Sequence, residues 1–275
     1  MLHTPLHSFC FLLLMLPLAS YAGCSKTITV PASPMGKSVI VEGETVTGIY
    51  PTLLLELTEK EDCPVKFVPV PQARALAMFE GGRADLLFPA FKTAHRDQFG
   101  EFIALIRSRP TLITLKSERS TINTLQQIID MPTMRLALVR GFDYGAQYQQ
   151  LITTLSKLGR IVLEPDALSV ARVIKAGHCQ ATIMTPALFF GAIHNDNRVS
   201  ELVEQLRFEP LEELPWGDSG VYLSHKSLNQ EDMEHLKKIL SRAANTDTLW
   251  KIYQRYYPAF ILKESVQQLE VRNPQ

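Results

Sequence analysis

The sequence lacks most of the patterns that identify enzymes and nucleic-acid-binding proteins. It has no Gly-x-Ser-x-Gly, no His-Glu-x-x-His and no Walker loop, which are signatures of common hydrolases, metalloproteases and nucleotide-binding enzymes. No Cys-x-x-Cys occurs, so neither a zinc site nor a dithiol redox site is indicated. Basic and acidic residues balance at 28 each, without a basic tail, which disfavours nucleic acid as a partner. We therefore expect neither a cofactor nor a bound metal.

Long hydrophobic runs are also absent after the start of the chain. Residues 9–18 form one unbroken apolar run, but this is shorter than the roughly 20 residues that cross a bilayer. Small residues at Ser20 and Ala22 suit signal-peptidase cleavage after Ala22, although no Lys or Arg precedes the run. We expect residues 1–22 to be a signal peptide and the mature chain to be a soluble periplasmic monomer. An alternative is lipid attachment at Cys24.

Cysteines are few, and one of the four lies in the signal peptide. In an oxidising compartment Cys24 and Cys63 could form a disulfide. Both lie beside expected strands, at residues 27–30 and 65–68, which would be neighbours if those strands pair. Cys179 is then left over, half-buried before a later strand.

The order of expected elements alternates strand and helix. The first half contains strands at 27–30, 65–70 and 84–88, a hairpin at 38–47 and helices at 51–60 and 72–79. The second half contains strands at 135–139, 160–163 and 181–184 and helices within 120–129 and at 146–158, 167–175 and 186–193. Helices at 229–244 and 247–257 end the chain. This order predicts an α/β fold in which a mostly parallel sheet is flanked by helices.

Two strand ends resemble each other and indicate two similar lobes. Residues 84–90 are A-D-L-L-F-P-A and residues 181–187 are A-T-I-M-T-P-A; the alternative is a chance repetition. A cleft between two lobes would bind a small molecule. We expect lobe 1 to comprise residues 23–112 and 222–275, and lobe 2 residues 113–221. The two connecting strands, at 111–115 and 219–224, would act as hinges.

Several segments together resemble a known family. They are Gly48-Ile49-Tyr50-Pro51, the strand at 65–70, the block from Phe79 to Arg96, Gly220-Val221-Tyr222-Leu223-Ser224 and Leu249-Trp250-Lys251-Ile252-Tyr253. The chain resembles the family 3 extracellular solute-binding proteins, the periplasmic receptors of polar amino-acid ABC importers. The resemblance implies a two-lobed, type II periplasmic-binding-protein fold. It also implies a small-molecule solute in the cleft and an ABC permease in the inner membrane as partner.

In the first lobe, the resemblance assigns Arg96 to the ligand carboxylate. A guanidinium can meet a carboxylate with two parallel hydrogen bonds, and the Thr93 hydroxyl could add a contact. The alternative for Arg96 is a surface ion pair with Asp97 or Glu101. The resemblance also places Phe88, Ala90 and Phe91 on the pocket wall, where an aromatic ring could stack on a ligand or simply fill the hinge region.

In the second lobe, the resemblance assigns the turn after the strand at 135–139 to the ligand. This turn comprises Arg140, Gly141, Phe142 and Asp143, and its glycine permits close backbone approach. Many amino-acid receptors carry an aspartate where this chain has Thr185, which cannot pair with a ligand ammonium. Asp143 could substitute, or it could cap the next helix. Tyr50 and Trp216 are further candidate walls, with core or hinge packing as the alternative.

The resemblance also leaves alternative functions open. Some proteins of this fold are dehydratases, and His95 is the one candidate acid or base beside Arg96. A ligand-sensing module for a membrane receptor is the third reading. A binding protein, not an enzyme, is the leading prediction because the carboxylate-binding block is present and catalytic motifs are not.

Overall fold

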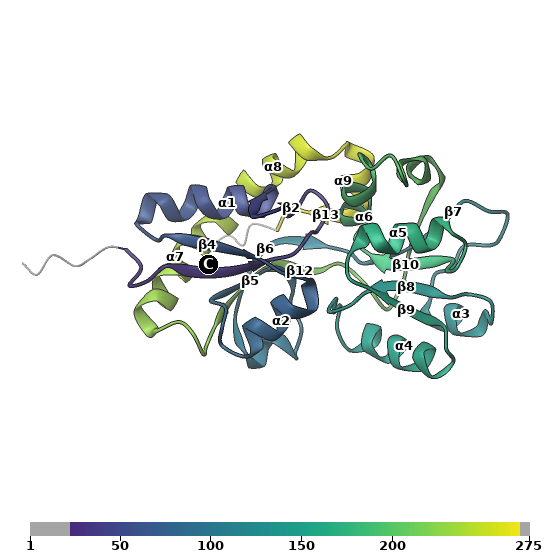
Figure 1. Cartoon of the computed structure of the whole chain (residues 1–275), viewed down its shortest axis with the longest axis horizontal. Coiled ribbons are helices and arrows are strands. Elements are labelled where there is room, and N and C mark those ends of the chain that lie inside the picture. Colours follow the sequence, from purple (N-terminus) through teal and green to yellow (C-terminus); the bar gives the residue numbers. More distant parts are fainter. Residues whose placement is uncertain (1–22, 270–275) are drawn as a thin grey trace, which may run out of the picture.

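Two sheets organise the chain, and each is flanked by helices (Figure 1). The structure is a computed structural model, and it describes residues 23–269; the expected signal peptide lies outside this range. We call the part built on the four-stranded sheet β13-β6-β12-β5 the first lobe, and the part built on the five-stranded sheet β11-β7-β10-β8-β9 the second lobe. No helix in residues 23–269 combines the length and apolar character needed to cross a bilayer.

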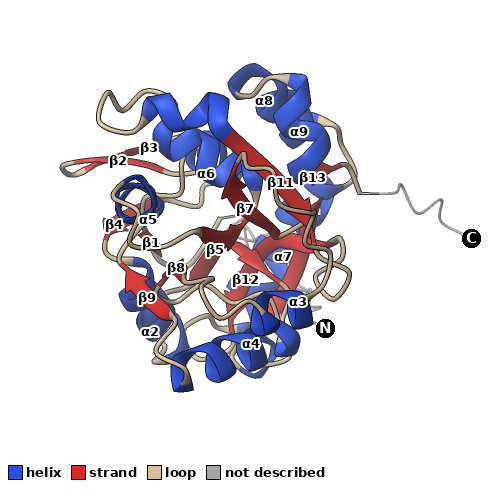
Figure 2. Cartoon of the chain, turned by 90° about the vertical axis from the view of Figure 1, so that its right-hand side faces the viewer, coloured by secondary structure: helices blue, strands red, loops and turns tan. Residues whose placement is uncertain are grey.

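The first lobe contains β1 (Ile28–Ala32), β2 (Ile40–Glu42), β3 (Thr45–Thr47), α1 (Ile49–Thr58), η1 (Glu59–Glu61), β4 (Val65–Pro69), α2 (Gln72–Glu80), β5 (Leu86–Phe91), η2 (Arg96–Gln98), β6 (Gly100–Ser108), β12 (Gly217–Ser224), α7 (Gln230–Ala244), α8 (Thr248–Tyr256), α9 (Ala259–Ser265) and β13 (Val266–Gln267). The second lobe contains β7 (Thr111–Leu115), α3 (Leu125–Asp130), β8 (Leu136–Val139), α4 (Ala146–Lys157), β9 (Ile161–Glu164), α5 (Ala167–Lys175), β10 (Ala181–Met184), α6 (Pro186–Ile193), η3 (Ser200–Gln205) and β11 (Leu206–Pro210). The β2–β3 hairpin lies at the periphery, outside both large sheets (Figure 2).

The α/β class is confirmed, but the expectation of a mostly parallel sheet in each lobe is wrong. The first lobe's four-stranded sheet is antiparallel throughout, and only β1–β4, β8–β9 and β8–β10 pair in parallel. The cause is the crossing of the chain between lobes. It leaves along β6 and β7 and returns along β11 and β12, so the outward and return strands lie antiparallel in both sheets.

The two crossings between the lobes are short, and they touch each other. Only Arg109 and Pro110 separate β6 from β7, and residues 211–216 separate β11 from β12. The Arg109 guanidinium lies 4.8 Å from the ring centre of Trp216, so Trp216 packs at the crossing. The lobes also meet where α9 packs against α6, and there the Ala187 N–H donates to Ser265 Oγ at 2.7 Å.

The first described residues are fastened by the expected disulfide between Cys24 and Cys63, which confirms that prediction. The sulfur of Cys24 is therefore not available for the alternative lipid attachment. Cys179 is a free, buried thiol whose pKa is raised by burial.

Loss of this disulfide should destabilise the protein. The bond closes a sequence separation of 39 residues, for which chain entropy gives about 4 kcal/mol. We expect C24S/C63S to lower the free energy of unfolding by up to that amount in urea titrations. A matched C179S variant, which removes only the free thiol, should change it far less. Equal losses in the two variants would contradict the assignment.

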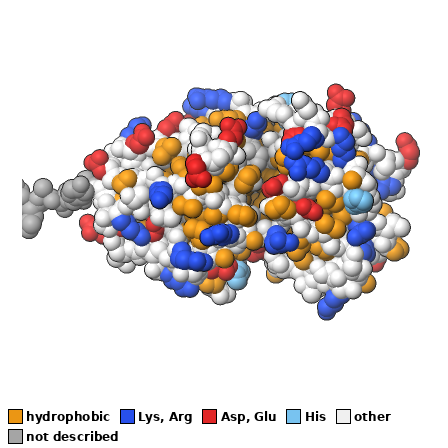
Figure 3. Space-filling model, viewed as in Figure 1, with side chains coloured by type: hydrophobic (Ala, Val, Ile, Leu, Met, Phe, Trp, Pro, Cys, Tyr) orange, Lys and Arg blue, Asp and Glu red, His pale blue; other side chains and the backbone are white. Residues whose placement is uncertain are grey.

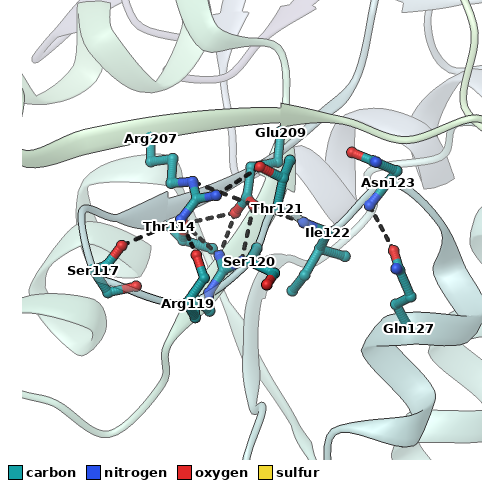
Figure 4. Close-up of polar contacts among 10 residues, drawn as sticks. All are labelled: Thr114, Ser117, Arg119, Ser120, Thr121, Ile122, Asn123, Gln127, Arg207 and Glu209. Carbon is teal, nitrogen blue, oxygen red and sulfur yellow. Dashed lines mark hydrogen bonds and ion pairs between the residues drawn. The ribbon is translucent and has the colours of Figure 1, made fainter.

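A buried carboxylate joins the crossing strands of the second lobe to the loop that follows β7 (Figure 4). Glu209 is fully buried on β11. Its oxygens accept hydrogen bonds from Arg119 Nη1 at 2.9 Å, Thr114 Oγ1 at 2.9 Å and the Ile122 N–H at 2.8 Å, and Arg207 Nε lies 3.4 Å away. Burial alone would raise the pKa of Glu209, but these hydrogen bonds outweigh it and lower the pKa below its usual value.

Replacing this carboxylate should destabilise the fold in a pH-dependent way. We expect Glu209→Gln to cost about 3 kcal/mol at pH 7, because two arginines lose their partner. Since the folded-state pKa is lowered, this contribution is fully present above the usual pKa of about 4.5 and is lost as pH falls through the folded value. Urea denaturation at pH 7 and pH 3 should therefore show a smaller difference at pH 3. Glu204→Gln, at an exposed position, is the control; a difference independent of pH would contradict the assignment.

Candidate functional site

A pocket lies between the two lobes, and residues from both line it. The surface is hollowed between the two halves, with hydrophobic side chains gathered around the hollow (Figure 3). The cavity encloses about 570 Å³ including the part open to solvent. Its lining residues are Met35, Ser38, Gln72, Pro89, Ala90, Phe91, Arg96, Ser108, Phe142, Asp143, Tyr144, Thr185, Ala187, Leu188, Ser219, Tyr253 and Val266.

Arg96 is the buried cation of this pocket, with only 3% of its surface exposed. Its Nη1 donates to the Phe91 carbonyl at 3.0 Å and to the Asp143 carbonyl at 3.5 Å, while Nε is buried without a partner in the described chain. None of the ion pairs found within residues 23–269 includes Arg96. Burial lowers the pKa of the guanidinium, and the charge of Asp143 opposes this shift.

The alternative placement of Arg96 as a surface ion pair is wrong. Asp97 instead accepts a hydrogen bond from the Tyr222 hydroxyl at 2.8 Å, and Glu101 pairs with Lys237. The turn that carries Arg96 is held from below, because Thr93 Oγ1 accepts from the Arg96 N–H at 3.3 Å. Thr93 is buried under the pocket and is not among its lining residues, so its role here is to position Arg96.

The first-lobe strand end contributes two of its three expected wall residues. Ala90 and Phe91 line the pocket. Phe88 is not among the lining residues, and the register of β5 against β12 shifts between Leu87 and Ala90. The ring of Phe88 packs in the core, 5.7 Å from Tyr50 and 6.2 Å from Phe67. The structure therefore corrects the assignment of Phe88 to the ligand.

Tyr50 is also a core residue and not a wall. It is 1% exposed, and its ring meets that of Tyr253 edge-on at 6.3 Å. Tyr253, on α8, is the residue that lines the pocket. Burial, followed by the neighbouring Tyr253, raises the pKa of Tyr50 well above its usual value.

The second-lobe turn divides between the pocket and other surfaces. Phe142, Asp143 and Tyr144 line the pocket, whereas Arg140 is exposed and donates to the Leu163 carbonyl. The ring of Tyr144 meets that of Phe91 edge-on at 4.9 Å, so an aromatic pair spans the two lobes. The expectation that Arg140 contacts the ligand is therefore not supported by its position.

Asp143 lies in the pocket and is held by its own turn. Its Oδ1 accepts from the Gly145 N–H at 2.9 Å and from Gln149 Nε2 at 3.0 Å. Burial alone would raise the pKa of Asp143, but these hydrogen bonds and the charge of Arg96 outweigh it and lower the pKa. The N-cap of α4 is Gly145, so Asp143 stabilises the turn before the helix and is not itself the cap.

Thr185 lines the pocket at the N-cap of α6. Its side chain makes no capping hydrogen bond. His95, the candidate acid or base, lies outside the pocket lining, where its Nε2 is 2.8 Å from Glu80 Oε1 and its side chain is 54% exposed.

Sequence reasoning missed most of the polar lining. Ser38, Gln72, Ser108 and Ser219 are all nearly buried and all reach the pocket. They come from four separate segments, and all four lie outside the motifs that carry the family resemblance. The strand pairing of Gly217 with Ser108 brings two of these segments together, and the pairing of Ser219 with Phe91 places them beside the first-lobe strand end.

Gly141 is the point of closest approach between the turn and the first lobe. It has φ of 90°, and a Cβ there would lie 3.0 Å from the backbone of Ala73 at the start of α2. The lack of a side chain at Gly141 thus lets the turn pack against the first lobe.

We expect Gly141→Ala to strain the packing of the two lobes, through both the positive φ and the contact with Ala73. It should weaken solute binding more than it lowers the melting temperature. Calorimetric titration and thermal unfolding measure the two effects. Gly159→Ala, which also has positive φ but no neighbour within 4 Å, is the matched control, and equal affinity losses would contradict the role of the contact.

The sequence matches the bacterial extracellular solute-binding proteins, family 3, over residues 28–259. The chain therefore belongs to this family, and its two-lobed α/β architecture is that of the type II periplasmic binding proteins. None of the curated proteins matches the chain.

Solved structures of binding proteins share the fold. The amino acid ABC transporter substrate-binding protein AbpA from Streptococcus pneumoniae, bound to L-arginine, is 17% identical with a TM-score of 0.65; the match covers 84% of this chain and 93% of that one. EhuB in complex with hydroxyectoine is 13% identical, with coverage of 87% and 92% and a TM-score of 0.65. AncCDT-1, an ancestral amino acid-binding protein and a precursor of cyclohexadienyl dehydratase, is 15% identical, with coverage of 84% and 96% and the same TM-score. At these identities the likeness concerns the fold alone.

Proposed function

We propose that the protein captures a small carboxylate-bearing solute in the cleft between its lobes by hinge closure. It then delivers the solute to an ABC permease in the inner membrane. The two bodies that would move about the hinge are residues 23–112 with 222–275 and residues 113–221. The strand pairing shifts their boundaries slightly, because Thr111 pairs in the second lobe's sheet and residues 217–221 pair in the first lobe's sheet. The working form is a periplasmic monomer.

The observation that carries the proposal is that the buried guanidinium of Arg96 has no ion-pair partner in the described chain, although the carboxylate of Asp143 lines the same pocket. Removing a charge from water costs several kcal/mol unless a partner of opposite charge compensates it. The two carbonyls on Nη1 satisfy one nitrogen and supply no negative charge. A ligand carboxylate would supply both the counter-charge and the acceptors that the remaining guanidinium N–H groups lack.

The residues that line the cleft give little support to the alternative of an enzyme on the same scaffold. His95, its one candidate acid or base, is exposed and paired with Glu80. A sensor that presents its ligand state to a membrane receptor would use the same carboxylate site. The proposal therefore rests on capture of the solute, and identifying a permease that binds the closed form separates transport from sensing.

Removal of the guanidinium should separate binding from folding. In a thermal-shift screen of small carboxylates, followed by calorimetric titration of the hits, we expect Arg96→Met to weaken binding by about 2–5 kcal/mol, roughly 30-fold to several thousand-fold. Arg96→Lys keeps the charge but not the planar fork, and should lose less. The unliganded Arg96→Met protein should be at least as stable as the wild type, because it no longer buries an uncompensated charge.

Arg255→Met, an exposed arginine on α8 without a side-chain partner in the described chain, is the matched control and should bind as the wild type does. Unchanged affinity for every hit in Arg96→Met would contradict the proposed function.

A further inference from the structure

Gln72 presents a fixed, unpaired amide to the pocket. It is the first residue of α2 and is 5% exposed. Its Oε1 accepts a hydrogen bond from the hydroxyl of Ser33, which is itself 5% exposed. Because that bond engages the amide oxygen, Nε2 is the donor left free in a residue that lines the cavity, and none of the hydrogen bonds found within residues 23–269 uses it.

The charges around Gln72 limit what this amide can meet. Arg96 and Asp143 are the only charged residues that line the pocket in the described part of the chain, so their charges cancel. A ligand with one carboxylate at Arg96 leaves the site with a single net negative charge, and a second carboxylate would add another in a partly buried space. An ammonium group cannot accept a hydrogen bond from the amide N–H of Gln72, whereas a neutral carbonyl oxygen can; the charged partner open to an ammonium in this pocket is Asp143.

We propose that Gln72 determines specificity by donating to a neutral carbonyl oxygen of the solute. The ligand class is an oxo acid, one carboxylate and one neutral carbonyl on a short carbon chain. This inference rests on the proposed function, since it assumes that the carboxylate lies at Arg96. The buried hydroxyl residues Ser38, Ser108 and Ser219 and the aromatic residues Phe91 and Phe142 line the same cavity and would contact the carbon chain.

Gln72 and Arg96 should affect the binding free energies of different ligands. A ligand that lacks the carbonyl leaves the amide N–H groups buried and unpaired on binding, which costs more than a missing exposed hydrogen bond. The discrimination should therefore appear between compounds that differ only at the carbonyl. Arg96 variants should weaken all carboxylates, whereas Gln72 variants should change only the preference among them.

The test compares matched compounds on purified mature protein by calorimetric titration. One set is 4-oxopentanoate, pentanoate and 4-aminopentanoate; a second set is 5-oxohexanoate, hexanoate and 5-aminohexanoate, and 2-oxopentanoate places the carbonyl beside the carboxylate. We expect at least one oxo acid to bind about ten-fold or more tightly than its parent acid and its amino analogue. In Gln72→Met, which keeps the side-chain length, that ratio should fall to near one while the parent acid keeps its affinity.

Gln254→Met, at an exposed position on α8, is the matched control and should retain the wild-type ratio. If Gln72→Met does not fold, Ser33→Ala provides the second arm. It leaves Gln72 in place but frees its amide to rotate, so the ratio should fall partway. Equal affinities for oxo and parent acids in the wild type, a ratio unchanged in Gln72→Met, or hits confined to other carboxylates would each overturn the assignment of Gln72. None of these results bears on the Arg96 variants, which test the carboxylate site separately.

Discussion

A buried guanidinium without an ion-pair partner in the described chain is the constraint on which the cleft depends. Arg96 lies on a turn that three contacts hold in place: Thr93 Oγ1 accepts from its backbone N–H, the Tyr222 hydroxyl bonds the Thr93 backbone, and the Phe91 carbonyl takes one guanidinium N–H. These groups belong to the first lobe, so the cation is positioned whether or not the second lobe is near. Its Nε has no partner in the described chain, and residues of both lobes line the pocket around it. The strength of a ligand contact there is thus coupled to the lobe arrangement.

The two strand ends that resemble each other in sequence, residues 84–90 and 181–187, lead to different parts of the pocket. The first, at β5, leads through Ala90 and Phe91 to the cation. The second, at β10, leads to Thr185 and the start of α6, where the free N–H of Ala187 is already satisfied by Ser265 from the first lobe. The second lobe therefore offers the solute neither a cation nor an open helix terminus. Its charged contribution is Asp143, and that carboxylate is largely engaged by its own turn.

The fold class and most helices were predictable because their signals are local. Asn229 caps α7 as expected, with its side chain accepting from the Asp232 N–H, and α5, α6, β7 and β10 have the expected bounds. Strand pairing was not predictable, since it depends on the crossings between lobes; β6, which has no flanking glycine-helix pattern, was missed, and with it the antiparallel first sheet. The same distinction between local and long-range signals applies to the site. Arg96 could be assigned because the local sequence block from Phe79 to Arg96 resembles the family, but Gln72, Ser38, Ser108 and Ser219 could not. Their placement depends on contacts between segments far apart in sequence, such as Ser33 with Gln72.

Under the proposed hinge closure, the contacts between the lobes would let a modest ligand contact control the motion. The lobes already meet at Gly141 against α2, at the Phe91–Tyr144 aromatic pair and at α6 against α9. A ligand shifts a two-state equilibrium only by the difference in its affinity for the two states. With much of the interface supplied by the protein, the open and closed forms can lie close in free energy, and a carboxylate that is fully coordinated only in the closed form is enough to decide between them. In the proposed function, the guanidinium of Arg96 is the group through which a carboxylate solute would favour the closed form.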